Sequence, residues 1–151
     1  MKEFWENQSL NKKSFIHSIS NLSNDKKFSQ EKSAAEKKKI ENLFNRINRK
    51  FNSCLEIGAG TCQWTQSLSE ISESVLATDI CKGMLDIGKE YIESKKLKSK
   101  INFFIGDICE EKIPENSPYD LIFISGLILY LSNEQFSKLI KFISFNTIAN
   151  S

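Results

Sequence analysis

The hydrophobic residues of this chain follow two different patterns on either side of about residue 50. Before that point they recur at helical spacing, which predicts one or two short helices within residues 1–28 and a longer helix from Ser29 to about Arg49. The apolar positions that carry this prediction are Phe15, Ile16, Ile19 and Leu22 in the first part, and Ile40, Leu43, Phe44 and Ile47 in the second. We therefore expect an N-terminal helical arm or cap over residues 1–50.

From residue 51 onward the pattern alternates between short apolar runs and amphipathic segments. The runs predict strands at 54–57, 74–78, 101–105 and 121–125, and the segments between and after them predict helices at 61–71, 82–97 and 133–146. Ser132 and Gln135 have the spacing of a capping box at the start of the last helix, whose expected buried face is Phe136, Leu139, Ile140 and Ile143.

The third and fourth runs, INFFI and LIFIS, are continuously apolar and do not alternate with polar residues. Such strands are covered on both faces, which is typical of a parallel sheet with helices in front and behind. The prediction is an α/β fold, a Rossmann-like, mostly parallel sheet over residues 51–151, with helices on both faces and the helical arm before it. The apolar stripe of the arm favours packing on the sheet. The alternative is a lid over a bound ligand, to which Trp5 or His17 contributes.

Composition narrows the function classes. The chain has 151 residues, of which 40% are apolar and 26% charged, as in one globular domain with a real core. The net charge of +2 provides no basic field, so we expect no nucleic-acid partner. No apolar run approaches the length of a membrane span, the N-terminus does not resemble a signal peptide, and the four cysteines form no C-x-x-C pair. We expect a cytoplasmic protein without a membrane partner, and a single histidine provides no ordinary metal site.

Polar or glycine residues follow each predicted strand, where ligands bind in open parallel sheets. They are Gly58 and Gly60 after the first strand, Asp79 after the second, Asp107 after the third, and Ser125 and Gly126 after the fourth. Asp79 comes about 20 residues after Gly60, the separation expected for a carboxylate that accepts hydrogen bonds from a ribose diol. The alternative is that Asp79 is only an acid favoured at the start of a helix.

Four segments taken in order, LEIGAGT, ATDICKGMLDIGKEY, FIGDI and YDLIFISGLILYL, resemble the successive motifs of class I S-adenosylmethionine-dependent methyltransferases. The resemblance covers about residues 50–145. Three features distinguish it from a nicotinamide-binding domain: Glu56 two residues before the first glycine, the pattern I-x-x-x-M-L after Asp79, and the run Gly106-Asp107-Ile108.

The resemblance implies S-adenosyl-L-methionine as cofactor and a small-molecule or sugar-like methyl acceptor. It implies that Glu56 orients the methionine amino group, that Gly58, Ala59 and Gly60 pass close to the methionine and ribose, and that Asp79 holds the ribose hydroxyls. It further implies that Ile80 and Ile108 flank the adenine, that Asp107 accepts from the adenine amino group, and that Ser125 and Gly126 line the space beside the sulfonium. No general base is evident, and Tyr130 is a candidate for the acceptor side or for packing.

Two features depart from this resemblance. Cys62 stands where a further glycine is common, and neither it nor Cys81 has a neighbour in sequence that would activate a methyl-accepting thiol. The family's sheet continues with roughly three further strands after the last helix, whereas this sequence stops at Ser151. The fourth strand would then lie at an open edge. The alternative hypotheses are a truncated, non-catalytic S-adenosylmethionine-binding fragment and a nicotinamide-binding half-domain.

Overall fold

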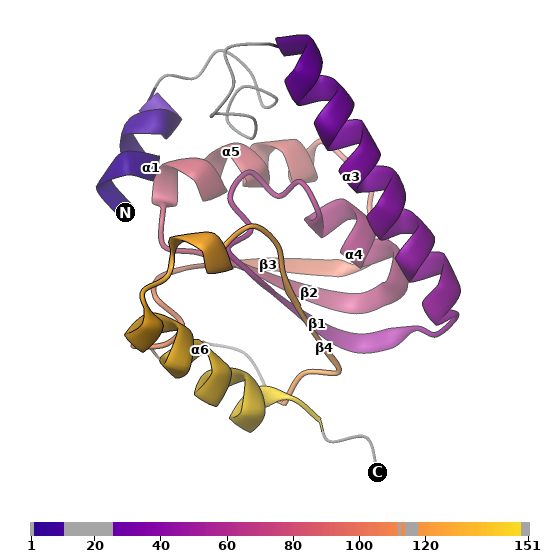
Figure 1. The fold of residues 1–151 in the computed structure, drawn as a ribbon. Coiled ribbons are helices and arrows are strands. Elements are labelled where there is room, and N and C mark those ends of the chain that lie inside the picture. Colours follow the sequence, from indigo (N-terminus) through magenta and orange to yellow (C-terminus); the bar gives the residue numbers. More distant parts are fainter. Residues whose placement is uncertain (1, 11–25, 112, 114–117, 149–151) are drawn as a thin grey trace.

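The computed structural model describes residues 2–10, 26–111, 113 and 118–148 (Figure 1). The helix predicted from Phe15, Ile16, Ile19 and Leu22 lies outside the described residues, as does His17. The helices are α1 (Lys2–Leu10), α3 (Lys26–Ile47), α4 (Thr65–Ile71), α5 (Lys82–Glu93) and α6 (Asn133–Asn146), with a short 3-10 helix, η1 (Ile128–Tyr130). The strands are β1 (Phe51–Ile57), β2 (Ser72–Asp79), β3 (Lys100–Ile105) and β4 (Leu121–Ile124).

The four strands form one parallel sheet in the order β3-β2-β1-β4. Leu55 lies opposite Leu76 of β2 on one side and Ile122 of β4 on the other, so the register brings the carboxyl ends of all strands to one edge. The parallel, Rossmann-like α/β prediction is confirmed. The prediction that the fourth strand lies at the edge is confirmed for the described part of the sheet.

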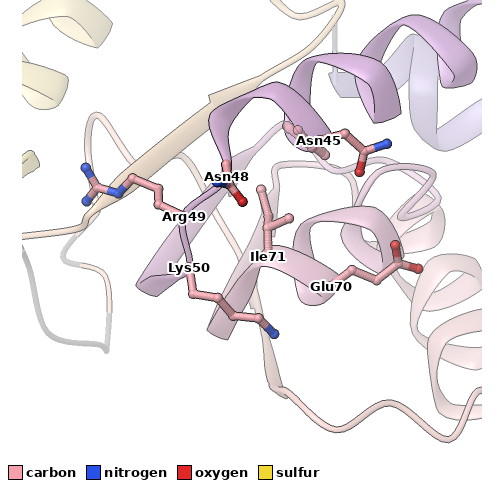
Figure 2. A pocket seen from close by; sticks show the side chains of 7 residues that line it. Asn45, Asn48, Arg49, Lys50, Glu70 and Ile71 are labelled. Carbon is pink, nitrogen blue, oxygen red and sulfur yellow. The ribbon is translucent and has the colours of Figure 1, made fainter.

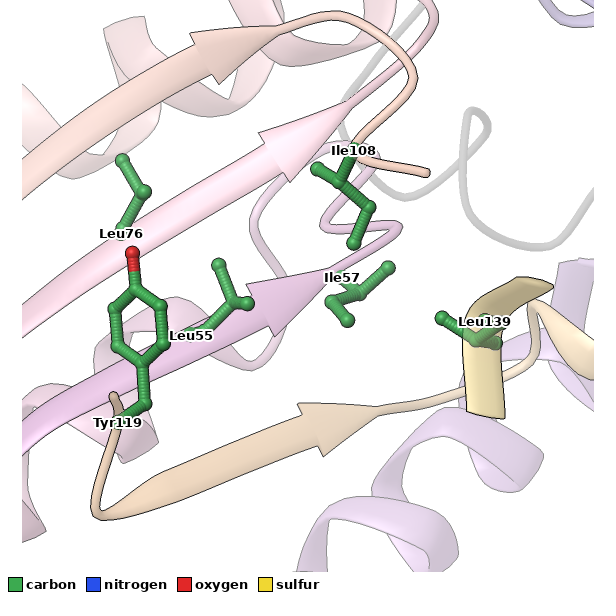
Figure 3. Packing of buried hydrophobic residues seen from close by; sticks show 6 residues of the cluster. All are labelled: Leu55, Ile57, Leu76, Ile108, Tyr119 and Leu139. Atoms are coloured by element: carbon green, nitrogen blue, oxygen red, sulfur yellow. The ribbon is translucent and has the colours of Figure 1, made fainter. Parts of the chain in front are cut away.

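Helices cover both faces of the sheet, as the continuous apolar strands predicted (Figure 1). Helices α3, α4 and α5 lie on one face and α6 lies on the other. On the α6 face, six buried residues form one cluster: Leu55, Ile57, Leu76, Ile108, Tyr119 and Leu139 (Figure 3). On the opposite face, Phe44 of α3 and Leu68 of α4 pack against Cys54 and Val75. The core thus lies on both sides of β1 and β2, while β3 and β4 remain half-exposed.

Three predicted helix boundaries were wrong. Helix α3 begins at Lys26 and not at Ser29, so Ser29 is internal to the helix and does not cap it. Helix α4 begins at Thr65 and not at residue 61, because Cys62 has a φ of +60°, which a right-handed helix excludes. Helix α5 ends at Glu93, where the Ser94 N–H bonds back to carbonyls of the last turn.

The capping box of Ser132 and Gln135 is present at the start of α6, but the predicted buried face of that helix was only partly right. Leu139 is buried, whereas Phe136 and Ile140 are exposed, because α6 contacts the sheet along a line narrower than its apolar stripe. After α6 the chain returns to the sheet: the Tyr119 N–H donates to the Asn146 carbonyl oxygen at 2.6 Å, and the N–H of Ile148 donates to the Tyr119 carbonyl oxygen at 3.0 Å. This bridge is parallel and extends the sheet beside the start of β4.

The edge of the sheet where the amino ends of β1 and β2 lie, away from the carboxyl ends of the strands, carries a surface pocket of about 290 Å³ (Figure 2). It is lined by Phe44, Asn45, Asn48, Arg49, Lys50, Glu70 and Ile71. None of the predicted site residues lies in it. In the described ranges, no helix combines the length and the apolar character needed to cross a membrane.

Candidate functional site at the carboxyl ends of the strands

The turn after β1 is fixed to the end of β2 by backbone hydrogen bonds. The N–H groups of Gly58 and Ala59 both donate to the Thr78 carbonyl oxygen, each at 2.9 Å. Gly58 and Gly60 have φ values of +75° and +53°, in the left-handed region that favours glycine. The glycines predicted from the sequence are therefore required by the backbone of this turn.

The carboxylate of Asp79 joins the glycine turn to the start of α5. Its Oδ2 accepts a hydrogen bond from the Gly60 N–H at 2.8 Å, and its Oδ1 accepts one from the Cys81 N–H at 2.8 Å. Burial raises the pKa of this carboxyl above its ordinary value, and these N–H groups act in the opposite direction. The sequence predicted that Asp79 and the glycine turn lie at the same edge of the sheet, and the structure places them in direct contact.

Glu56 is a buried carboxyl at the end of β1, with only 2% of its surface exposed. Thr65, in the first turn of α4, donates to Glu56 Oε2 at 2.5 Å. Burial raises the pKa of Glu56 to about 8, the Thr65 hydrogen bond lowers it, and the nearby Asp79 charge raises it. Sequence reasoning missed Thr65, because its separation of nine residues from Glu56 follows no periodicity of strand or helix.

Glu56 should make the stability of the fold depend on pH. The unfolded chain loses this proton near the ordinary pKa of 4.5, whereas the folded chain keeps it up to about pH 8. The contribution of Glu56 to the free energy of unfolding therefore falls as pH rises between these values, by at most about 1.4 kcal/mol per pH unit. We expect Glu56→Gln to lose less stability than the wild type between pH 5 and pH 8 in urea unfolding. The exposed Glu70→Gln is the matched control, and parallel stability–pH curves for wild type and Glu56→Gln would contradict the prediction.

The end of β3 reaches the same edge through its backbone. The Gly106 N–H donates to the Asp79 carbonyl oxygen at 3.0 Å. Asp107 Oδ1 accepts from the Cys109 N–H at 3.0 Å, and the Asp107 N–H donates to Glu111 at 3.0 Å. Asp107 thus closes the turn after β3 in addition to any contact with a ligand.

Ile108 and Ile80 are placed differently from one another. Ile108 is buried in the core cluster beside Ile57 (Figure 3), whereas Ile80 is half-exposed after β2. Packing therefore explains Ile108 by itself. The adenine contacts of both residues stay predictions.

The loop after β4 lies against the glycine turn of β1. A Cβ added to Gly58 would lie 3.3 Å from the Cβ of Leu127, so the chain that follows Ser125 and Gly126 passes directly beside Gly58. Gly126 has a φ of +73° and is exposed. Tyr130, in η1, meets the ring of Trp5 from α1 edge-on at 5.5 Å between centroids.

Three observations show that the site has space and polar capacity for a ligand. A Cβ added at Gly60 or at Gly126 would meet nothing within 4 Å. The hydroxyl of Thr61, the residue after Gly60, is buried and has no hydrogen-bond partner among the described residues. The residues present therefore fit a ligand that carries several polar groups along the strand ends.

Thiol and metal chemistry find no support at this site. Burial raises the pKa of Cys62 to about 12 and that of Cys81 to about 11, which is the opposite of what an activated nucleophile needs. In the part of the chain that the structure describes, no three His, Cys, Asp or Glu side chains are grouped so that they could hold a metal ion.

Comparisons with known proteins identify the family of this chain. The chain is 35% identical over 81 residues to phosphoethanolamine N-methyltransferase 1 of Caenorhabditis elegans and 32% identical over 88 residues to that of Triticum aestivum. These matches cover 54% and 57% of this chain but only 16% and 17% of the two relatives.

The solved structures that share the fold include two methyltransferases. That of Haemonchus contortus phosphoethanolamine N-methyltransferase 1, with phosphoethanolamine and S-adenosylhomocysteine, has a TM-score of 0.77 at 23% identity and covers 99% of this chain and 30% of its own. Magnesium protoporphyrin IX methyltransferase from Synechocystis PCC 6803, with bound S-adenosylhomocysteine, has a TM-score of 0.73 at 13% identity, covering 97% and 66%. A family model described as a methyltransferase domain matches residues 54–144, which is more than half of the sequence. The chain therefore belongs to the methyltransferase-domain family.

Proposed function

We propose that this chain binds S-adenosyl-L-methionine at the carboxyl ends of its strands and that the protein transfers the methyl group to a small-molecule acceptor. The observation that carries the proposal is the contact between Asp79 and Gly60. It places a carboxylate against a glycine turn, where a nucleoside can approach the backbone closely while its ribose hydroxyls donate to the carboxylate.

The remaining residues supply distinct functions around that contact. Asp79 would accept from the ribose hydroxyls, and Gly58, Ala59 and Gly60 would leave room for the methionine and ribose. Glu56 would orient the methionine amino group. The charge of that ammonium ion would favour the ionised form of the buried Glu56 carboxyl, which accepts a hydrogen bond from Thr65. Asp107, Ile80 and Ile108 would bind the adenine, and Ser125 and Gly126 would line the acceptor side.

The cofactor supplies an activated methyl group on a sulfonium, and the chain supplies orientation and electrostatics. For the acceptor we propose a small amine of the phosphoethanolamine type. Support comes from the two curated relatives, whose names give that acceptor. The net charge of +2 also fits a small molecule better than a nucleic acid.

Isothermal titration calorimetry with S-adenosylhomocysteine, S-adenosylmethionine and NADH tests the cofactor. We expect micromolar binding of the first two and none of NADH, because Glu56 matches an ammonium group that NADH lacks. Transfer of a radiolabelled methyl group from S-adenosylmethionine to phosphoethanolamine tests the acceptor. Binding of NADH alone would contradict the proposed cofactor, whereas cofactor binding without methyl transfer to phosphoethanolamine would contradict the proposed acceptor.

A further inference from the structure

Helix α1 is held to the first turn of α5 by the side chain of Glu6. Its Oε1 accepts a hydrogen bond from the Lys82 N–H at 3.1 Å, and its Oε2 accepts one from the Gly83 N–H at 3.4 Å. The first N–H groups of a helix have no partner within it, and the same end favours negative charge. Cys81, at the N-cap position, makes no side-chain capping bond. Glu6 therefore supplies from α1 the cap that the local sequence of α5 lacks.

The close approach of the two helices depends on Gly83. A Cβ at this position would lie 2.1 Å from the Oγ of Ser9 and 2.8 Å from its Cβ, so only glycine leaves space for α1. Ser9 is buried, and its hydroxyl donates to the Glu6 carbonyl oxygen at 2.7 Å. The contact between α1 and α5 therefore combines the Glu6 carboxylate and the Ser9 hydroxyl of α1 with Gly83 of α5.

The other flank of α1 reaches the loop after β4. The ring of Trp5 contacts that of Tyr130 at 5.5 Å between centroids, in a T-shaped arrangement. Helix α1 thus has two anchors, the Glu6 hydrogen bonds to α5 and the Trp5–Tyr130 contact. Asp79 lies near the first anchor. Burial raises the pKa of Asp79, and the charge of Glu6 raises it further. Helix α1 therefore reaches from the first turn of α5, just after the end of β2 that carries Asp79, to the segment after β4 that carries Ser125, Gly126 and Tyr130 (Figure 1).

A helix of nine residues has little stability by itself. The position of α1 consequently depends on its two anchors. Five residues of α1 are exposed to solvent: Lys2, Glu3, Phe4, Asn7 and Leu10.

We propose that Glu6 is a positioning residue that latches α1 over the cofactor site as a lid, and that release of this latch controls how fast S-adenosylmethionine enters and leaves. This inference rests on the proposed function, since it requires that the cofactor occupy the strand ends beneath α1. Glu6 acts here through α1 and does not need to touch the cofactor. Loss of its cap should shift α1 toward the released state.

The test compares Glu6→Ala with Glu3→Ala, which removes an exposed acid from the same helix. We expect Glu6→Ala to increase hydrogen exchange in residues 2–10 and to release radiolabelled S-adenosylmethionine about 5- to 10-fold faster, as the loss of a helix cap predicts. Glu3→Ala should match the wild type in both measurements. Faster exchange with unchanged release would show that α1 does not cover the cofactor, and slower release would show that α1 obstructs the site; each result overturns the lid.

A second pair of variants tests the same latch without removing a charge. Gly83→Ala should displace α1 and accelerate release while leaving α5 at least as helical by circular dichroism, because alanine has a higher helix propensity than glycine. Adding Ser9→Gly removes the nearest clashing atoms and should restore slow release. Failure of the wild type to bind S-adenosylmethionine would reject the proposed function and the lid together. Normal binding with identical release in all variants would reject the lid alone.

Discussion

Asp79→Asn should weaken binding of S-adenosylhomocysteine by about 100-fold while leaving the fold intact. The amide keeps the shape of the carboxyl but cannot accept from two ribose hydroxyls and from the Gly60 and Cys81 N–H groups together. Hydrogen bonds to a charged acceptor are worth roughly 1.5–3 kcal/mol each, so losing this acceptor can account for about 3 kcal/mol of binding. Calorimetric titration measures the dissociation constant directly.

The burial of Asp79 lets this experiment distinguish an effect on cofactor affinity from an effect on the free energy of unfolding. Because burial raises its pKa, the ionised side chain is costly to the fold, and a neutral amide relieves that cost. Asp79→Asn should therefore unfold in urea within about 1 kcal/mol of the wild type. Asp86→Asn, which removes an exposed acid paired with Lys82 at 2.6 Å, is the control and should bind normally. Unchanged affinity in Asp79→Asn would remove the central support for the proposed site.

The pairing of Asp79 with Gly60 could be predicted from the sequence because parallel strands bring their carboxyl ends to one edge. Strands β1, β2 and β3 contain the short apolar runs from which they were predicted, and the observed register aligns their carboxyl ends. The hydrogen bond from Thr65 to Glu56 could not be predicted, because it depends on the residue at which the turn after β1 ends and α4 begins.

The contact of Glu6 with α5 could not be predicted from the sequence for a different reason. It joins residues 76 and 77 positions apart, and it forms because Cys81 provides no cap and Gly83 leaves space, neither of which is a pattern along the chain. The burial of residues on α6 was also predicted only in part. The apolar stripe of α6 predicted that Phe136 and Ile140 are buried, but both are exposed. A stripe shows which residues are apolar and not which of them a neighbouring element covers.

Cys62 and Gly88 form a compensating pair between the glycine turn and α5. The resemblance to methyltransferases places glycine at position 62, and the backbone there has a φ of +60°, which a cysteine adopts only with strain. Its side chain is fully buried and points at α5, where a Cβ at Gly88 would lie 2.4 Å from the Cys62 Sγ and 2.7 Å from the carbonyl carbon of Thr61. Cysteine fits in the turn because α5 carries glycine opposite it.

Gly88→Ala should therefore destabilise the protein, although helix propensity alone predicts the reverse. Alanine in a helix interior gains about 1 kcal/mol over glycine. An added methyl group with no free volume costs typically 1–3 kcal/mol, and here one of the clashing atoms belongs to the backbone and cannot rotate away. The steric cost lies at the upper end of that range, and we expect a net loss of up to about 2 kcal/mol in urea unfolding. Binding of S-adenosylhomocysteine should also weaken, because the displaced turn is the one that carries Gly60.

The double variant Gly88→Ala/Cys62→Gly distinguishes this explanation from a general intolerance of α5 to substitution. Glycine at position 62 removes Sγ and Cβ and suits the positive φ, so it should recover part of the lost stability. Recovery stays incomplete because the Thr61 backbone contact remains. Asp86→Ala, on the exposed face of α5, is the control and should change stability by less than about 0.5 kcal/mol. A Gly88→Ala protein as stable as the wild type would mean that the turn yields without cost, and the cysteine could then no longer be explained by the glycine that faces it.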